Sequence, residues 1–139
     1  MNEMNKLLYT AKIHTTGGRE GGEAKSSDGR LHVHFTVPGA PGEGTNPEQM
    51  FGAGWSACFE SAIAIAARKK KVALPPDLAI DAEVDLNLIG GNYTLGARLN
   101  VSLPGLPRDV AQSLVEQAEQ LCPYSRAVKG NIDAVIRLV

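Results

Sequence analysis

The stretch TNPEQMFGAGWSACFESAIAIA, residues 45–66, decides the fold because it predicts one long, apolar helix. Asn46 is suited to cap this helix, Pro47 to its first turn, and Glu48 to the positive end of its dipole. From Met50 onward, small and apolar residues face nearly every direction, and a helix that is apolar all round is usually buried. We therefore expect a core helix, wrapped by sheet or packed on its copy in a second subunit.

A membrane span must be considered for the same stretch, because its length is close to what a bilayer requires. Polar residues interrupt it, however, among them Ser56 and Glu60, and its glycines weaken it. The basic run RKKK at positions 68–71 is typical of a solvated last turn. We expect no membrane contact, and the formal net charge of -1 argues against nucleic acid as a partner.

The composition is that of an ordinary globular protein, with 139 residues, 43% hydrophobic and 21% charged. We expect a single domain over residues 1–139. The first ten residues contain no apolar run long enough for a secretory signal, so we place the protein in the cytoplasm. In that reducing compartment two cysteines favour metal binding, catalysis or redox sensing over a permanent disulfide. Their spacing matches no common zinc motif.

The chain before the long helix predicts two strands joined by a glycine-rich loop. Residues 7–15 and 31–37 alternate apolar and polar side chains, as half-buried strands do. Four glycines surround Arg19 in the loop, which indicates either a flexible connection or a backbone that carries Arg19 close to another group. His32 and His34 share the polar face of the second strand. They could share a metal, but solvated histidines are commoner there, so we expect no metal site.

The chain after the long helix predicts a hairpin, a second helix and a last strand. Residues 80–103 alternate on both sides of a Gly-Gly-Asn turn, with Leu86 and Leu88 among the side chains expected to point inward. An apolar stripe from Val110 to Leu121 predicts an amphipathic helix that Pro123 ends. The order ββ-α-ββ-α-β predicts an α+β fold in which antiparallel sheets wrap around the long helix, with helices on one side of a sheet.

The two cysteines lie on different predicted helices, Cys58 within the apolar one and Cys122 at the end of the second. Only the fold could bring them together. They could be buried small hydrophobes or reactive thiols. A reactive thiol needs a nearby cation, because the thiolate is the nucleophile and a free thiol titrates near ~8.5. A cation about 4 Å away, at an effective dielectric of about 20, contributes ~4 kcal/mol, or roughly three pKa units.

Three motifs together resemble one family: TNPEQMFGAGWSACFESAI, CPYSRAVKGNI and the early GGREG. They are similar to the organic hydroperoxide resistance (Ohr) branch of the Ohr/OsmC family of thiol peroxidases, over essentially the whole chain. The CPYS form around the second cysteine and the short N-terminal region favour Ohr over the OsmC branch. Trp55 departs from the tyrosine of the family, which bears on the shape of the pocket. The resemblance implies an intertwined homodimer with active sites at the subunit interface.

The resemblance also implies roles for four residues. Cys58 would be the peroxidatic cysteine and Cys122 the resolving one. Arg19 would favour the thiolate and orient the peroxide, and Glu48 would hold Arg19. The implied activity reduces alkyl and fatty-acid hydroperoxides to alcohols through a Cys58 sulfenic acid and a Cys58–Cys122 disulfide. No cofactor is bound in this scheme, and dihydrolipoamide or a lipoylated protein supplies the electrons.

The helix itself adds one geometric prediction. Glu48 and Cys58 are ten positions apart, so an unbroken helix separates them by ~15 Å along its axis. We therefore predict that Arg19 and Glu48 approach Cys58 from the other subunit. Phe51 and Trp55 share the face of Cys58, where they are candidates for lining the substrate pocket or, equally, for the dimer core.

Three other functions stay open from the sequence alone. An OsmC-like peroxidase would accept a wider range of peroxides. A redox-sensing or apolar-ligand-binding dimer would change shape without turnover. Two purely structural cysteines would make a Cys58→Ser variant behave like the wild type.

Overall fold

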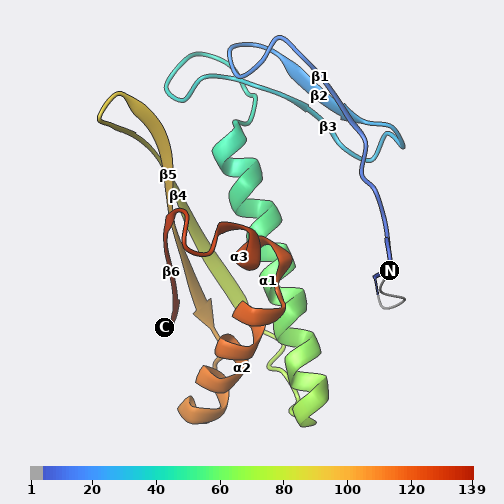
Figure 1. The fold of residues 1–139 in the computed structure, drawn as a ribbon, viewed down its shortest axis with the longest axis vertical. Helices are drawn as coiled ribbons and strands as arrows, with labels where there is room; N and C mark the ends of the chain where they lie inside the picture. Colours follow the sequence, from blue (N-terminus) through green and yellow to red (C-terminus); the bar gives the residue numbers. More distant parts are fainter. Residues whose placement is uncertain (1–4) are drawn as a thin grey trace. The chain divides into compact units, whose positions relative to one another are not determined.

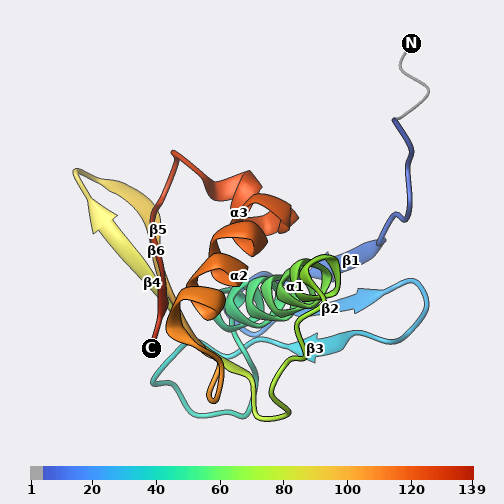
Figure 2. The same cartoon turned by 90° about the horizontal axis from the view of Figure 1, so that it is seen from below.

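The computed structural model describes residues 5–139, and the chain divides into two compact units, Met1–Pro47 and Glu48–Val139 (Figures 1 and 2). Each unit contains a three-stranded sheet, and the α+β class is confirmed. The elements in chain order are β1 (Ile13–Thr16), β2 (Glu23–Ser26), β3 (His32–His34), α1 (Pro47–Lys70), β4 (Ala79–Ile89), β5 (Asn92–Ser102), α2 (Arg108–Leu121), α3 (Pro123–Val128) and β6 (Asp133–Leu138).

The first unit holds the antiparallel sheet β1-β2-β3. Strand β2 lies inside the stretch predicted as a loop, so that part of the prediction was wrong. The prediction of a strand over residues 7–15 was also too long, because Leu7, Leu8 and Tyr9 lie outside β1 and are exposed. Strand β2 is only four residues long, and the chain turns after Ser26. The ladder can therefore pair only four residues of β1.

Strand β3 is shorter than the predicted strand over residues 31–37, because pairing with β2 stops at His34. Beyond β3, Phe35 forms an isolated parallel bridge with Thr45, and the Thr36 N–H donates to the Thr45 carbonyl. The predicted alternation holds within the strand. His32 and His34 are exposed, and Val33 pairs with the buried Ala24.

The predicted long helix is confirmed as α1, which begins directly after Asn46 and ends in basic residues. In the single chain one side of α1 is exposed, at Ala53, Ala57 and Ile65, and burial of that side against a second copy stays a prediction. By length and composition alone α1 could cross a membrane, but one face of it packs into a protein core, which is how a core helix behaves. The buried residues of that face are Gly52, Trp55, Phe59, Ala62, Ile63, Ala66 and Ala67.

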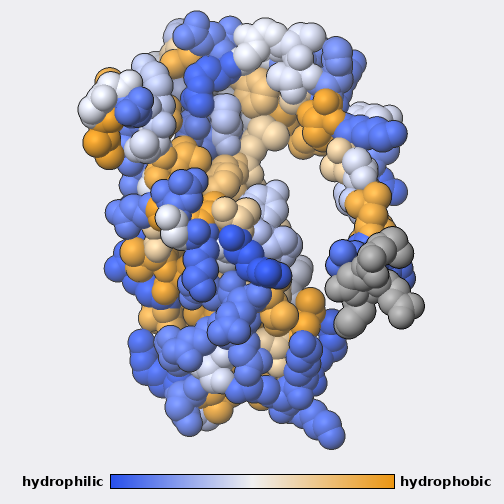
Figure 3. Space-filling view, in the orientation of Figure 1, coloured by the Kyte–Doolittle hydropathy of each residue, from blue (hydrophilic) through white to orange (hydrophobic). Residues whose placement is uncertain are grey.

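The predicted hairpin is confirmed as β4 and β5, which pair antiparallel along their full length. Gly90 and Gly91 have φ values of 57° and 82°, so the two-residue turn needs the left-handed backbone that glycine adopts most easily. Leu86 and Leu88 were expected to point into the core, but both are exposed at the far end of the hairpin. The end of the hairpin bends away from the helices there (Figure 1), and hydrophobic side chains show at the surface (Figure 3).

The end of the chain differs from the prediction in two ways. Pro123 ends α2 as expected, but it also begins the short helix α3, because proline suits a first helical turn. Strand β6 pairs parallel with β5, whereas antiparallel sheets were expected. The crossover through α2 and α3 returns the chain to the start of β5, which is the connection that parallel pairing requires.

The core of the second unit lies between the sheet β4-β5-β6 and the two longer helices, which cover one face of it as predicted (Figures 1 and 2). It joins the buried face of α1 to β5 and to the apolar stripe of α2. The contributing residues outside α1 include Ala97, Leu99, Val101, Leu103, Ala111, Leu114, Val115 and Ala118.

Candidate functional site

The two cysteines, far apart in sequence, meet in the second unit. The Sγ atoms of Cys58 and Cys122 are 3.3 Å apart, and both thiols are free. A disulfide bond is about 2.05 Å long, so a small movement would suffice to join the two sulfur atoms. Cys122 is fully buried, whereas Cys58 is only partly so. Of the two cysteines, Cys58 is therefore the one that is open to solvent in the single chain.

Different local structures hold the two sulfurs. Cys58 lies in the middle of α1, on a rigid helix. Cys122 lies between α2 and α3 in an extended conformation, with φ −71° and ψ 119°. Its N–H donates to the Ala118 carbonyl at 2.8 Å, and its own carbonyl accepts from the Arg126 N–H at 3.0 Å. The break between the helices thus turns the second thiol toward the first while satisfying its backbone.

The surroundings of Cys58 favour the neutral thiol. Burial raises the pKa of Cys58, and the hydrogen bond with the Cys122 thiol raises it further. A hydrogen bond to the Tyr124 backbone acts in the opposite direction and lowers the pKa. A positive charge near Cys58 would oppose these effects and favour the thiolate.

Aromatic side chains pack next to the cysteine pair. The rings of Phe51 and Trp55 meet edge to face with centroids 5.6 Å apart, and Phe51 and Tyr124 are 6.3 Å apart. Trp55 is 1% exposed, and its Nε1–H donates to the buried Ser125 hydroxyl at 2.9 Å. This bond ties α3 to α1 beside Cys58. The predicted role of Phe51 and Trp55 in binding substrate stays a prediction.

Gly54 allows the Tyr124 side chain of α3 to pack closely against α1. A Cβ at this position would lie 2.8 Å from the Tyr124 hydroxyl oxygen and 3.3 Å from its ring. Tyr124 and Ser125 were missed as site residues by the sequence analysis, although both belong to the CPYS motif. Their contacts with α1 depend on helix α3, and no periodicity signal indicates a helix of six residues.

Arg19 and Glu48, the other two predicted site residues, lie on different elements. Arg19 lies in the turn between β1 and β2, where Gly17, Gly18 and Gly21 have positive φ. Glu48 lies in the first turn of α1, which continues without a break to Cys58. Glu48 and Cys58 of one chain are therefore ~15 Å apart along the helix axis. Their approach to Cys58 from a second subunit stays a prediction.

Comparison with known proteins extends these observations to the whole chain. Residues 39–137 match the family model described as OsmC-like protein. An organic hydroperoxide resistance protein of Xanthomonas axonopodis pv. citri is 43% identical over 99% of both chains. The OhrA protein of Bacillus subtilis is 36% identical over 97% of this chain and 99% of its own.

A solved structure gives the same result in three dimensions. The organic hydroperoxide resistance protein OhrB of Bacillus subtilis superposes with a TM-score of 0.88. It is 38% identical, and the match covers 96% of this chain and all of that one. On this evidence the chain belongs to the organic hydroperoxide resistance branch of the Ohr/OsmC family.

Proposed function

We propose that this protein acts in organic hydroperoxide resistance as a thiol peroxidase, with Cys58 as the peroxidatic and Cys122 as the resolving cysteine. The names of its relatives support the role in resistance. The observation that carries the catalytic part is the 3.3 Å separation between a partly exposed and a fully buried thiol. The same geometry favours attack by Cys58, because it is the less buried of the two cysteines.

The proposed reaction balances in three steps. The Cys58 thiolate attacks the outer peroxide oxygen, the O–O bond breaks, and the leaving alkoxide takes a proton to become the alcohol. The Cys122 sulfur then attacks the Cys58 sulfenic acid, forming the S–S bond and releasing water. A dithiol reduces this disulfide by exchange and is itself oxidised to a disulfide. The two electrons that reduce the peroxide therefore come from the external dithiol.

Arg19 supplies the positive charge that the first step needs, and Glu48 holds the guanidinium in place. A cation about 4 Å from the sulfur, at an effective dielectric of about 20, contributes ~4 kcal/mol. That contribution opposes the burial and the Cys122 contact that raise the pKa of Cys58. Because Glu48 lies ~15 Å along the helix from its own Cys58, both residues act from the partner subunit of a homodimer.

The exposed apolar surface supports this dimer. Large hydrophobic side chains at the free end of the β4-β5 hairpin are exposed in the single chain, where Leu88 is 64%, Ile89 62% and Tyr93 76% exposed. Part of the apolar helix α1 is exposed as well. Apolar surface of this kind marks contact sites between proteins, and a second copy of the chain is the occupant that the family fold implies.

The apolar surroundings of the cysteines suggest the substrate class, and the resemblance to the Ohr family implies the electron donor. The Phe51 and Tyr124 rings lie 6.3 Å apart on the two helices that flank the cysteine pair, and such apolar surface favours an alkyl or fatty-acid hydroperoxide over hydrogen peroxide. The donor is dihydrolipoamide or a lipoylated protein, no cofactor stays bound, and the cytoplasm is the proposed location. An OsmC-like enzyme with a wider peroxide range is the alternative peroxidase, and a non-catalytic redox sensor is the alternative of another class.

Steady-state turnover separates these functions. With dihydrolipoamide as reductant, we expect repeated reduction of cumene hydroperoxide and slower reduction of hydrogen peroxide. Equal rates on the two peroxides would favour the OsmC-like alternative. Oxidation of the thiols without turnover would favour the redox sensor and contradict the peroxidase. A Cys58→Ser variant that behaves like the wild type would indicate structural cysteines.

A further inference from the structure

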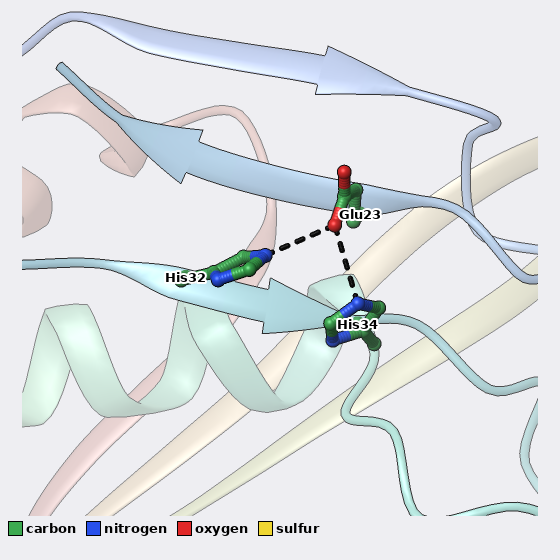
Figure 4. A group of neighbouring side chains, drawn as sticks. All are labelled: Glu23, His32 and His34. Atoms are coloured by element: carbon green, nitrogen blue, oxygen red, sulfur yellow. Dashed lines mark hydrogen bonds and ion pairs between the residues drawn. The ribbon is translucent and has the colours of Figure 1, made fainter. Parts of the chain in front are cut away.

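Three side chains on one face of the first sheet converge on a single point (Figure 4). The Nε2 atom of His32 lies 2.9 Å from Oε2 of Glu23, and the Nε2 atom of His34 lies 3.2 Å from the same oxygen. These three atoms all lie within 4.8 Å of one another. The cluster belongs entirely to the first unit, so it is independent of the cysteine pair and of the proposed peroxidase activity.

The strand register produces this convergence. Glu23 on β2 is paired directly with His34 on β3, and His32 lies two residues before His34 on the same face. Opposite residues in an antiparallel pair have Cβ atoms about 4.5–5.5 Å apart, and diagonal ones lie within reach of long side chains. The backbone therefore holds all three ligands close together before any ion binds.

The donor set is one that borderline divalent metals prefer. Imidazole nitrogen and carboxylate oxygen both bind Zn²⁺, with bonds of about 2.0–2.2 Å, so tetrahedral neighbours lie roughly 3.3–3.5 Å apart. The observed nitrogen–oxygen separations of 2.9 and 3.2 Å need only small side-chain rotations to reach that geometry. His32, His34 and Glu23 are partly or largely exposed, which leaves room for water as a further ligand.

The charges around the cluster are mixed. A hydrogen bond with His32 holds the pKa of Glu23 below its ordinary value, and the charges of His32, Lys25 and His34 act in the same direction. Lys25 pairs with His32 across the strands and adds a like charge that weakens cation binding. Glu43 lines the same surface depression as His34 and adds a negative charge nearby.

We propose that Glu23, His32 and His34 form a binding site for a divalent transition-metal ion of the zinc class, with one ion per chain. Glu23 Oε2 and the Nε2 atoms of both histidines are the protein ligands. The ion replaces the contacts that both histidines make with Glu23, and each imidazole then binds it through the Nε2 lone pair, with the ring proton on Nδ1. Because the ligands come from β2 and β3, the bound ion links these two strands and stabilises the sheet.

Isothermal titration with ZnCl₂ tests the site, using the full chain with Cys58→Ala and Cys122→Ala so that the thiols do not bind the metal. We expect one ion per chain with a dissociation constant in the micromolar range, and no competition from millimolar Mg²⁺. His32→Asn, His34→Asn and Glu23→Gln should each weaken binding by an order of magnitude or more. All three are surface changes, and thermal unfolding without metal should match the parent.

His14→Asn provides the matched control. His14 on β1 pairs with Lys25 and therefore shares the sheet face, but it lies outside the cluster. We expect this variant to bind zinc like the parent. The proposal is overturned if the parent does not bind zinc below millimolar concentration. It is also overturned if the His32→Asn and His34→Asn variants bind as tightly as the parent, or if His14→Asn weakens binding as much as they do.

Discussion

The cysteine pair and the Glu23, His32 and His34 cluster are built in opposite ways. Cys58 and Cys122 meet where helices pack in a protein core, and one of the two sulfurs is fully buried. The cluster on the first sheet lies at the surface and is set by strand register. A buried site ties chemistry to packing, so changes near the cysteines should alter both stability and activity. Changes in the surface cluster should alter binding alone.

The largest expected effect is at the exposed sulfur. Cys58→Ser should reduce turnover of cumene hydroperoxide with dihydrolipoamide by roughly 1000-fold or more, because the nucleophile is lost. Cys122→Ser should also stop turnover, yet Cys58 should still react once with one equivalent of peroxide. Mass spectrometry of the product should then show one added oxygen. Two variants that lose the first oxidation equally would contradict the division of roles.

The next effect concerns the charge that the cysteine site needs. Arg19→Ala should raise the pKa of Cys58 above the ~8.5 of a free thiol, because burial and the Cys122 contact then act without an opposing cation. Alkylation of Cys58 by iodoacetamide at pH 7 should slow by roughly 100-fold, with its midpoint moved to higher pH. Arg30→Ala, in the turn between β2 and β3, is the control and should leave the profile unchanged.

A smaller effect is expected from the hydrogen bond that ties α3, next to Cys122, to α1. Ser125→Ala leaves the buried Trp55 N–H without its partner and should lower the free energy of unfolding by about 1–3 kcal/mol. Ser61→Ala, at an exposed position on α1, should change it by less than about 0.5 kcal/mol. Urea unfolding measures both. Equal stability of the two variants would mean that the Trp55–Ser125 bond does not hold α3 in place.

The smallest effect is expected at Gly54. Gly54→Ala gains up to ~1 kcal/mol of helix propensity, but its Cβ displaces the Tyr124 ring beside Cys122. We expect little net change in stability and a slower disulfide-forming step, followed by thiol loss after rapid mixing with peroxide. Gly52→Ala, whose Cβ would contact Val84 at 3.3 Å, is the matched control. An unchanged rate in Gly54→Ala would show that the Tyr124 position does not matter for resolution.

The sequence predicted the long elements, in which a regular pattern of apolar residues continues over many positions. Three long patterns were placed correctly: the apolar run of α1, the alternating β4-β5 hairpin and the stripe of α2. Each continues over many residues and has clear turn residues at its ends. Strand β2 and helix α3 were missed because they are short and lie next to glycine or proline. The parallel pairing of β6 depends on a crossover, which no local pattern encodes.

The two sites also differ in how far the sequence alone predicts them. Cys58 and Cys122 were identified through their flanking motifs, and the fold then brought them together. His32 and His34 were noted as a pair, but Glu23 lay in a stretch predicted as loop. The register that places it opposite His34 could not be inferred. Periodicity gives the face of a residue, whereas a site made of two strands also needs their alignment.

Free-thiol titration tests the central claim most directly. The reduced protein is treated with one equivalent of cumene hydroperoxide, or with an equal dose of hydrogen peroxide, and then with dihydrolipoamide. We expect both thiols to be lost, faster with the organic peroxide, and both to return with the dithiol. Survival of both thiols after cumene hydroperoxide would contradict a Cys58–Cys122 catalytic cycle.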